Sequence, residues 1–196
     1  MSRDTSFYYS FLVLPNRKRR AIIAVWDFCR AVDDAVDQST VDGVTTNRTA
    51  TVLESELAGW RHEVDCCFTE KEPLTEQGRR LKPHVKHFKL PRKSLEDLVE
   101  GVEMDIHSRR YETFDELYEY CLRVASSVGL ICIEIFGYCN KRTQDYAISL
   151  GVALQLTNII RDLPADLEAG RDRLAARAAG RASGFPRLRQ RGGGPC

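Results

Sequence analysis

Apolar side chains recur at intervals of three and four residues along most of this chain, which is the period of an amphipathic helix. Between residues 16 and 37 the pattern includes Ile22, Val25, Cys29 and Val32. The same period predicts further helices over residues 46–67, 75–88, 94–106, 114–136 and 143–163. No window shows the sustained alternation of a half-buried strand. We therefore predict an all-α protein with six or seven helices.

Local signals refine the helix boundaries. Pro83 is expected to bend or end its helix, because proline removes a backbone donor. Ser94 can cap the next helix, with Asp97 supplying an acid in the first turn. Gly137 can close the long helix that precedes it.

Composition divides the chain into two parts. The 196 residues, 43% of them apolar, suit one globular domain. The net charge of +1 hides an asymmetry, since residues 171–196 carry seven arginines and one acid. This segment is rich in Arg, Gly, Ala and Pro and has no apolar stripe, so we predict disorder. Such a tail could attract RNA electrostatically, but it lacks interleaved aromatics and we expect no nucleic-acid partner.

Cysteine usage and the early apolar run bear on location. Seven cysteines cannot all pair in a disulfide framework, and their positions in apolar helical stretches favour buried free thiols in a reducing compartment. The apolar run over residues 7–14 is too short to span a bilayer and lacks a cleavage site. We expect a cytoplasmic protein; contact with a membrane surface and the oligomeric state stay open.

Two acidic pairs are the candidate chemistry. Asp33 and Asp37 are four residues apart, as are Asp162 and Asp166, so each pair points from one helical face. Either pair alone would be read as ordinary solvated helix surface. Magnesium takes hard oxygen ligands and commonly binds one or two carboxylates together with substrate phosphate. Two matching pairs therefore favour a magnesium-bridged diphosphate between two helices.

Neighbouring residues strengthen this interpretation. At 100° per residue, Trp26 and Arg30 fall within about 60° of the first acidic pair. Arginine at that position is suited to gripping a phosphate. Gln155 and Asn158 share a stripe with the second pair on an otherwise apolar segment. Because buried unpaired polar groups are costly, this stripe is expected to face a polar cavity.

Longer motifs resemble the squalene/phytoene synthase family. SFYYSFLVLPNRKRRAIIAVWDFCRAVDDAVD is similar to the family's first aspartate-rich region, and YAISLGVALQLTNIIRD to its second. YCLRVASSVGLICIEIFGY resembles the central helix, and GVEMDIHSRRYETFDEL the stretch between. The resemblance covers residues 5–171. It implies an isoprenoid-synthase-type helical bundle around a central cavity.

The resemblance also implies residue roles. Asp33, Asp37, Asp162 and Asp166 would hold Mg²⁺ ions that bind and activate diphosphate. Tyr120, near the reacting carbons, and Arg30 are the catalytic candidates. The other implied positions are a metal or diphosphate contact at Asn158, diphosphate-binding arginines at Arg30 and Arg161, a cavity glutamine at Gln155, substrate-binding Ser6 and Phe7, and a cavity wall at Val124, Ser127 and Gly129.

The activity implied is a head-to-head condensation of two prenyl diphosphates. SFYY and VASSVGLICIEIFGY are most similar to bacterial presqualene diphosphate synthases of hopanoid biosynthesis, which use farnesyl diphosphate. Phytoene synthases, which use geranylgeranyl diphosphate, share the acidic motifs. A chain-elongating prenyltransferase or terpene cyclase is a less favoured alternative. A non-catalytic assembly protein on the same fold is another, although all four aspartates are present.

Two features depart from the family pattern. Pro164 lies between Asp162 and Asp166, so the helix is expected to kink or stop there and could misplace Asp166. After Gly170 the tyrosine-leucine-proline segment and further helices of the family are missing, which suggests an incomplete domain over 1–170 and a basic tail that is natural or out of frame. We expect exposed apolar surface where helices are missing.

Overall fold

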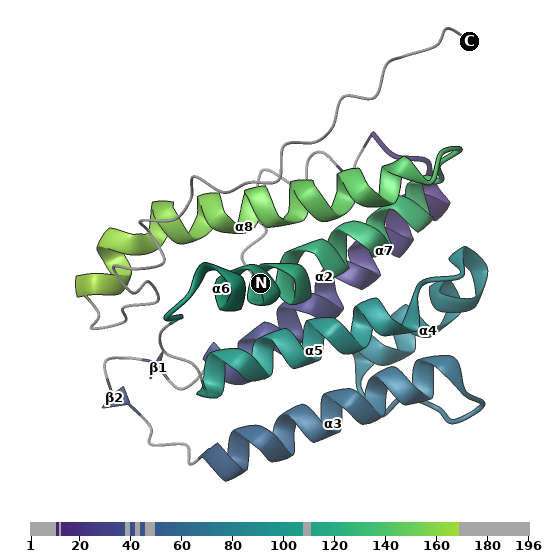
Figure 1. The fold of residues 1–196 in the computed structure, drawn as a ribbon. Helices are drawn as coiled ribbons and strands as arrows, with labels where there is room; N and C mark the ends of the chain where they lie inside the picture. Colours follow the sequence, from purple (N-terminus) through teal and green to yellow (C-terminus); the bar gives the residue numbers. More distant parts are fainter. Residues whose placement is uncertain are drawn as a thin grey trace, which may run out of the picture.

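The computed structural model describes residues 11, 13–37, 40, 41, 44, 45, 50–107 and 111–168 (Figure 1). The side chains of residues 36–45, 50, 51, 105–107 and 164–168 lie outside this description. So do Ser6, Phe7 and the segment 171–196. The expectations placed on those positions, including a domain boundary after Gly170, stay predictions.

Helices account for almost all of the described chain, as the sequence predicts. They are α2 (Asn16–Asp37), α3 (Ala50–Phe68), α4 (Glu76–Phe88), α5 (Arg92–His107), α6 (Phe114–Cys121), the π-helical turn η1 (Leu122–Ser126), α7 (Ser127–Phe136) and α8 (Arg142–Glu168). The small exception among the described residues is β1 (Thr40–Val41), which pairs antiparallel with β2 (Val44–Thr45) and was not predicted. None of the helices in the described part of the chain combines the length and the apolar character needed to cross a bilayer.

A large apolar core joins α2, α3, α4, α5 and α7. Side chains on one side of α2 pack against α4, α5 and α7, and α3 covers α4 and α5 from below in Figure 1. Phe28 and Val32 of α2 are fully buried, and so are Leu57, Leu81 and Leu95 of the surrounding helices. Burying each such side chain contributes roughly 1.5–3 kcal/mol. This core fixes the first acidic helix in place.

A second, smaller cluster lies between α6 and α8. It contains Tyr111, Leu117, Tyr120 and Cys121 on one side and Val152 and Ile159 of α8 on the other. The chain from α6 through η1 to α7 therefore contacts both clusters, since Ile131 and Ile135 of α7 belong to the large core.

Neither proline ends its helix, which was one of the two outcomes expected at each position. α4 continues through Pro83, because Leu81 and Val85 on either side are buried and tertiary packing outweighs the lost hydrogen bond. The backbone of α8 continues past Pro164 to Glu168, so the helix does not stop there.

One helix begins earlier than expected, another contains an irregular turn, and the expected helix end at Gly137 is confirmed. α5 begins at Arg92, directly after Pro91, because the Ser94 amide already bonds to the Pro91 carbonyl at 3.1 Å. Ser94 is thus a buried residue of the first turn and not a cap. The expected single helix over 114–136 contains the π-helical turn η1. Gly137 closes it as expected, at φ 78°.

All six cysteines that the structure describes are free thiols, as expected. Four of them are buried, but Cys132 is half-buried and Cys139 is exposed, so the expected burial does not hold for every thiol. Burial raises the pKa of Cys67 to about 12 and the pKa values of Cys121 and Cys132 to about 11. Burial, together with the nearby Asp33 carboxylate, raises the pKa of Cys29 further. These thiols are therefore neutral at pH 7.

Candidate active site

The first acidic stripe lies on the side of α2 that points away from the core. Arg30 and Asp33 are exposed, while Cys29 and Val32, which border this stripe on its core-facing edge, are buried. Arg30 reaches Asp34 one turn later, with Nη2 3.8 Å from Oδ1. The backbone of α2 extends to Asp37, so the predicted pair shares one continuous helix.

The second stripe lies on the flank of α8. Gln155, Asn158 and Asp162 are half-buried, and the neighbouring Ile159 is packed into the smaller cluster. Arg161 holds both carboxylate oxygens of Asp162, at 2.7 Å from Nε and 2.9 Å from Nη2. This hydrogen bonding raises the pKa of Arg161. A cation and an anion are thus paired next to the polar stripe.

Tyr120 and Val124 come from α6 and η1. Tyr120 is only 3% exposed and its ring lies 5.1 Å from that of Tyr111. Val124 is half-buried beside the same cluster and faces Gly101 of α5. Tyr120 therefore lies in a buried apolar environment, and Val124 lies at its edge.

The antiparallel pairing of α8 with η1 and α7 brings some of these residues together. Gly129 approaches Ala147, and Gly151 approaches Ser126, so the two helices run in opposite directions. The same antiparallel arrangement places α6 beside the later part of α8. Tyr120 of α6 accordingly shares one cluster with Leu156 and Ile159 of α8. Those residues flank Gln155 and Asn158.

The two helices that carry the acidic stripes share one neighbour. α7 packs against both α2 and α8. Among the side chains that the structure describes, no three acidic, histidine or cysteine groups converge into a ready metal site. The Asp37 and Asp166 side chains lie outside the description, so the predicted four-aspartate set is not tested.

A family model for squalene/phytoene synthase matches residues 1–183. The chain belongs to this family. The match continues beyond residue 171, where the sequence analysis placed the end of the resemblance.

Individual relatives of this synthase-family chain fall into two groups. It is 34% identical over 178 residues to the 15-cis-phytoene synthase of Synechocystis sp., covering 85% of this chain and 50% of the relative. It is 34% identical over 171 residues to the presqualene diphosphate synthase of Zymomonas mobilis, covering 87% and 56%. Equal identity leaves the substrate undecided between these groups.

A solved structure shares the fold. The squalene synthase of Alicyclobacillus acidocaldarius is 25% identical and superposes with a TM-score of 0.73, over 86% of this chain and 60% of that one. The chain therefore spans about half to three-fifths of the length of these relatives. The expected helical fold of the family is confirmed.

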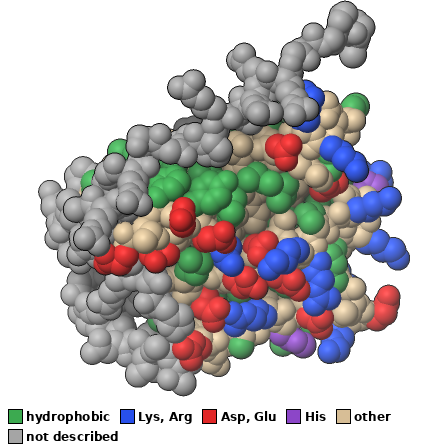
Figure 2. Space-filling view, viewed as in Figure 1, with side chains coloured by type: hydrophobic (Ala, Val, Ile, Leu, Met, Phe, Trp, Pro, Cys, Tyr) green, Lys and Arg blue, Asp and Glu red, His purple; other side chains and the backbone are tan. Residues whose placement is uncertain are grey.

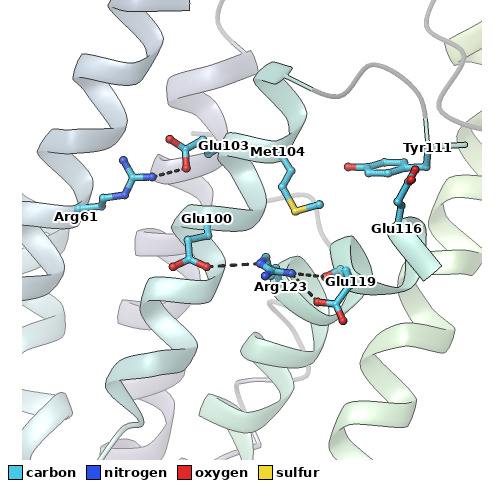
Figure 3. Close-up of a pocket in the computed structure, with 8 residues that line it drawn as sticks. All are labelled: Arg61, Glu100, Glu103, Met104, Tyr111, Glu116, Glu119 and Arg123. Carbon is cyan, nitrogen blue, oxygen red and sulfur yellow. Dashed lines mark hydrogen bonds and ion pairs between the residues drawn. The ribbon is translucent and has the colours of Figure 1, made fainter. Parts of the chain in front are cut away.

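Sequence reasoning missed a charged cavity on this synthase-family chain. It has a volume of about 640 Å³. Its lining residues are Arg61, Glu100, Glu103, Met104, Tyr111, Glu116, Glu119 and Arg123 (Figure 3). Arg61 pairs with Glu103, and Arg123 lies 2.8 Å from Glu119 and 3.5 Å from Glu100.

The ion pairs explain why this cavity is better read as structural. The Glu119 and Arg123 spacing of four residues was a signal that could have revealed part of it. Each arginine is engaged by carboxylates of the same molecule, and Glu116 completes the capping box of α6 with Thr113. The Glu103 carboxylate, paired with Arg61, belongs to this arrangement.

Proposed function

We propose that this chain binds an allylic prenyl diphosphate through Mg²⁺ and takes part in joining two farnesyl diphosphates to presqualene diphosphate. The observation that supports this most is the pair of acidic stripes, on α2 and α8, carried by helices that both pack against α7. Family membership adds independent support. Geranylgeranyl diphosphate is the alternative substrate, favoured by the equally similar phytoene synthase.

The donor set fits magnesium. Asp33 is exposed and Asp162 is half-buried, and both would offer hard carboxylate oxygens to Mg²⁺. Asp37 and Asp166 would supply the second carboxylate of each helix, and Asn158 an amide oxygen. When bound, the metal would neutralise charge that develops on the departing diphosphate.

The chain's own residues would serve both ends of the substrate. Arg30 and Arg161 would exchange their present carboxylate partners for diphosphate oxygens as the allylic C–O bond breaks. Tyr120, Val124 and Gln155 would line the prenyl chain and keep water from the allylic cation. The double bond of the second prenyl diphosphate then forms the new carbon–carbon bond, and loss of a proton closes the cyclopropane ring. Ser6 and Phe7 are proposed to contact the substrate from the amino-terminal segment.

Titration calorimetry with farnesyl diphosphate, with and without Mg²⁺, tests this proposal. We expect binding only with Mg²⁺ and at least about tenfold weaker binding by Asp162→Asn, since even outer partners of metal ligands contribute that much. Asp145→Asn is the matched control, because Asp145 is exposed in the first turn of the same helix. Equal affinity with and without Mg²⁺, or no binding at all, would contradict the proposal. Binding of geranylgeranyl diphosphate alone would overturn the choice of farnesyl diphosphate.

A further inference from the structure

The π-helical turn η1 interrupts an otherwise regular helix between α6 and α7. The Ser127 amide bonds to the Leu122 carbonyl five residues back, which is the bond that defines a π-turn. An extra residue per turn rotates everything after it by roughly 100° relative to an uninterrupted helix. Such turns occur frequently at functional sites.

This rotation separates two packing surfaces. Before η1, Leu117 and Tyr120 face the smaller cluster with α8. After η1, Ile131 and Ile135 face the large core with α2 and α5. The direction in which Tyr120 points is therefore coupled to the π-turn, because a regular helix would align these two sets of residues differently.

The α8 side of η1 is in very close contact. A Cβ atom at Gly151 would lie 2.6 Å from Ser126 Cα and 2.7 Å from its backbone nitrogen. The Ser126 hydroxyl, in a residue only 2% exposed, donates to the Ile148 carbonyl at 2.7 Å. This hydrogen bond joins η1 to α8 at one defined register.

The α5 side closes on η1 in the same way. A Cβ atom at Gly101 would lie 2.7 Å from Val124 Cγ1 and 2.9 Å from Arg123 Cβ. Arg123 also forms ion pairs with Glu100 of α5 and Glu119 of α6. The turn therefore packs closely against α5 at Gly101 and against α8 at Gly151. The Ser126 hydrogen bond adds a directional contact with α8.

We propose that Ser126 is a positioning residue of the candidate site. Through Ile148, its hydroxyl holds η1 against α8, and so keeps Tyr120 and Val124 beside the turn of α8 that carries Gln155 and Asn158. This inference rests on the proposed prenyl diphosphate site. Ser126 acts on the wall for the prenyl chain. Of the proposed diphosphate ligands, Arg30 and Asp33 lie on α2, and Asn158, Arg161 and Asp162 lie ten or more residues beyond Ile148 on α8.

Binding of two ligands separates positioning from general stability. The full chain, in Mg²⁺, is titrated with farnesyl diphosphate and with inorganic diphosphate. For Ser126→Ala we expect affinity for farnesyl diphosphate to fall about tenfold, the effect of a small misfit in an apolar pocket. Affinity for inorganic diphosphate should stay within about twofold of the unmodified chain, since a small shift of the apolar wall leaves the charged ligands in place.

Ser149→Ala is the matched control. Ser149 also donates to a helical carbonyl, that of Asp145 at 2.9 Å, but it is exposed and bonds only within α8. This variant should bind both ligands as the unmodified chain does.

The remaining outcomes distinguish failure of this inference from failure of the proposed function. Equal weakening of both ligands by Ser126→Ala would show a merely structural role and overturn the inference, as would unchanged binding of both. If the unmodified chain binds neither ligand in Mg²⁺, the proposed function itself fails and the inference fails with it.

Discussion

Two helical glycines of this protein, Gly151 and Gly59, differ in the space around their Cα atoms. At Gly151 a methyl group would meet the backbone of Ser126, which cannot move aside like a flexible side chain. At Gly59, exposed on α3, nothing lies within 4 Å of the added atom. The helical period of the sequence does not distinguish them, because the difference lies in the neighbouring helix.

Substitution by alanine should therefore change stability in opposite directions. We expect Gly151→Ala to lower the free energy of unfolding by about 2 kcal/mol, the cost of overpacking less the gain in helix propensity. Gly59→Ala should raise it by about 0.5–1 kcal/mol. Urea denaturation followed by circular dichroism measures both. Equal effects of the two substitutions would show that α8 and η1 are not in tight contact.

The connection between α3 and α4 depends on one buried carboxylate. Glu63 is 3% exposed and accepts hydrogen bonds from the Leu74 amide at 2.7 Å, the Thr75 amide at 3.1 Å and the Thr75 hydroxyl at 2.5 Å. Thr75 in turn caps α4 by accepting from the Gly78 amide at 3.0 Å. Both carboxylate oxygens of Glu63 face donors, so the interaction requires an acceptor on each side.

Glu63→Gln should destabilise the protein by about 2–3 kcal/mol, because the amide nitrogen cannot accept and turns one donor–acceptor pair into two facing donors. Thermal unfolding of the variant measures this loss. Glu70→Gln, exposed in the same connection, is the control and should be within about 0.5 kcal/mol of the unmodified chain. A similar small effect at Glu63 would mean that the connection does not need the carboxylate.

The helices were predictable where their signals are local. Apolar spacing located α2, Thr75 marked the start of α4, and Gly137 marked the end of α7. The π-turn was not predictable, because the bonds that stabilise it come from residues far along the chain, such as Ile148. Continuation of α8 past Pro164 to Glu168 was likewise not predictable from the residues around the proline.

At the candidate site, the sequence supplied the spacing of the acids but not their partners. Arg30 reaches Asp34, and Arg161 grips its own neighbour Asp162. The helical period of the sequence predicts neither ion pair, because the rotamers of the side chains decide which partners meet. The register that places Tyr120 in one cluster with Leu156 was also absent from local patterns, because it depends on how closely two helices approach.

The molecule as a whole leaves one face of α8 apolar and open. Tyr146, Leu150, Leu154 and Ile160 are 66%, 42%, 53% and 66% exposed. Figure 2 shows hydrophobic side chains gathered on the upper part of the visible face, with acidic and basic ones intermixed below. These four side chains form an exposed apolar stripe along α8.

Replacing these four residues together with glutamine should lower the fluorescence of bound anilinonaphthalene sulfonate several-fold and raise solubility, because the dye binds clustered apolar surface. The control is Leu74→Gln, since Leu74 is 75% exposed but isolated. Its dye fluorescence should not change. Unchanged dye binding in the fourfold variant would mean that the stripe is covered in solution.

The packing of α2 has a consequence for how the chain is made. Its core-facing side contacts α4 and α5, but it also needs α7, which ends at Phe136, and there Lys18 donates to the Phe136 carbonyl at 2.7 Å. At about 5–20 residues per second, a ribosome takes roughly 6–24 s to travel between these two points. During synthesis, part of the apolar side of α2 therefore stays unburied until α7 has emerged from the ribosome.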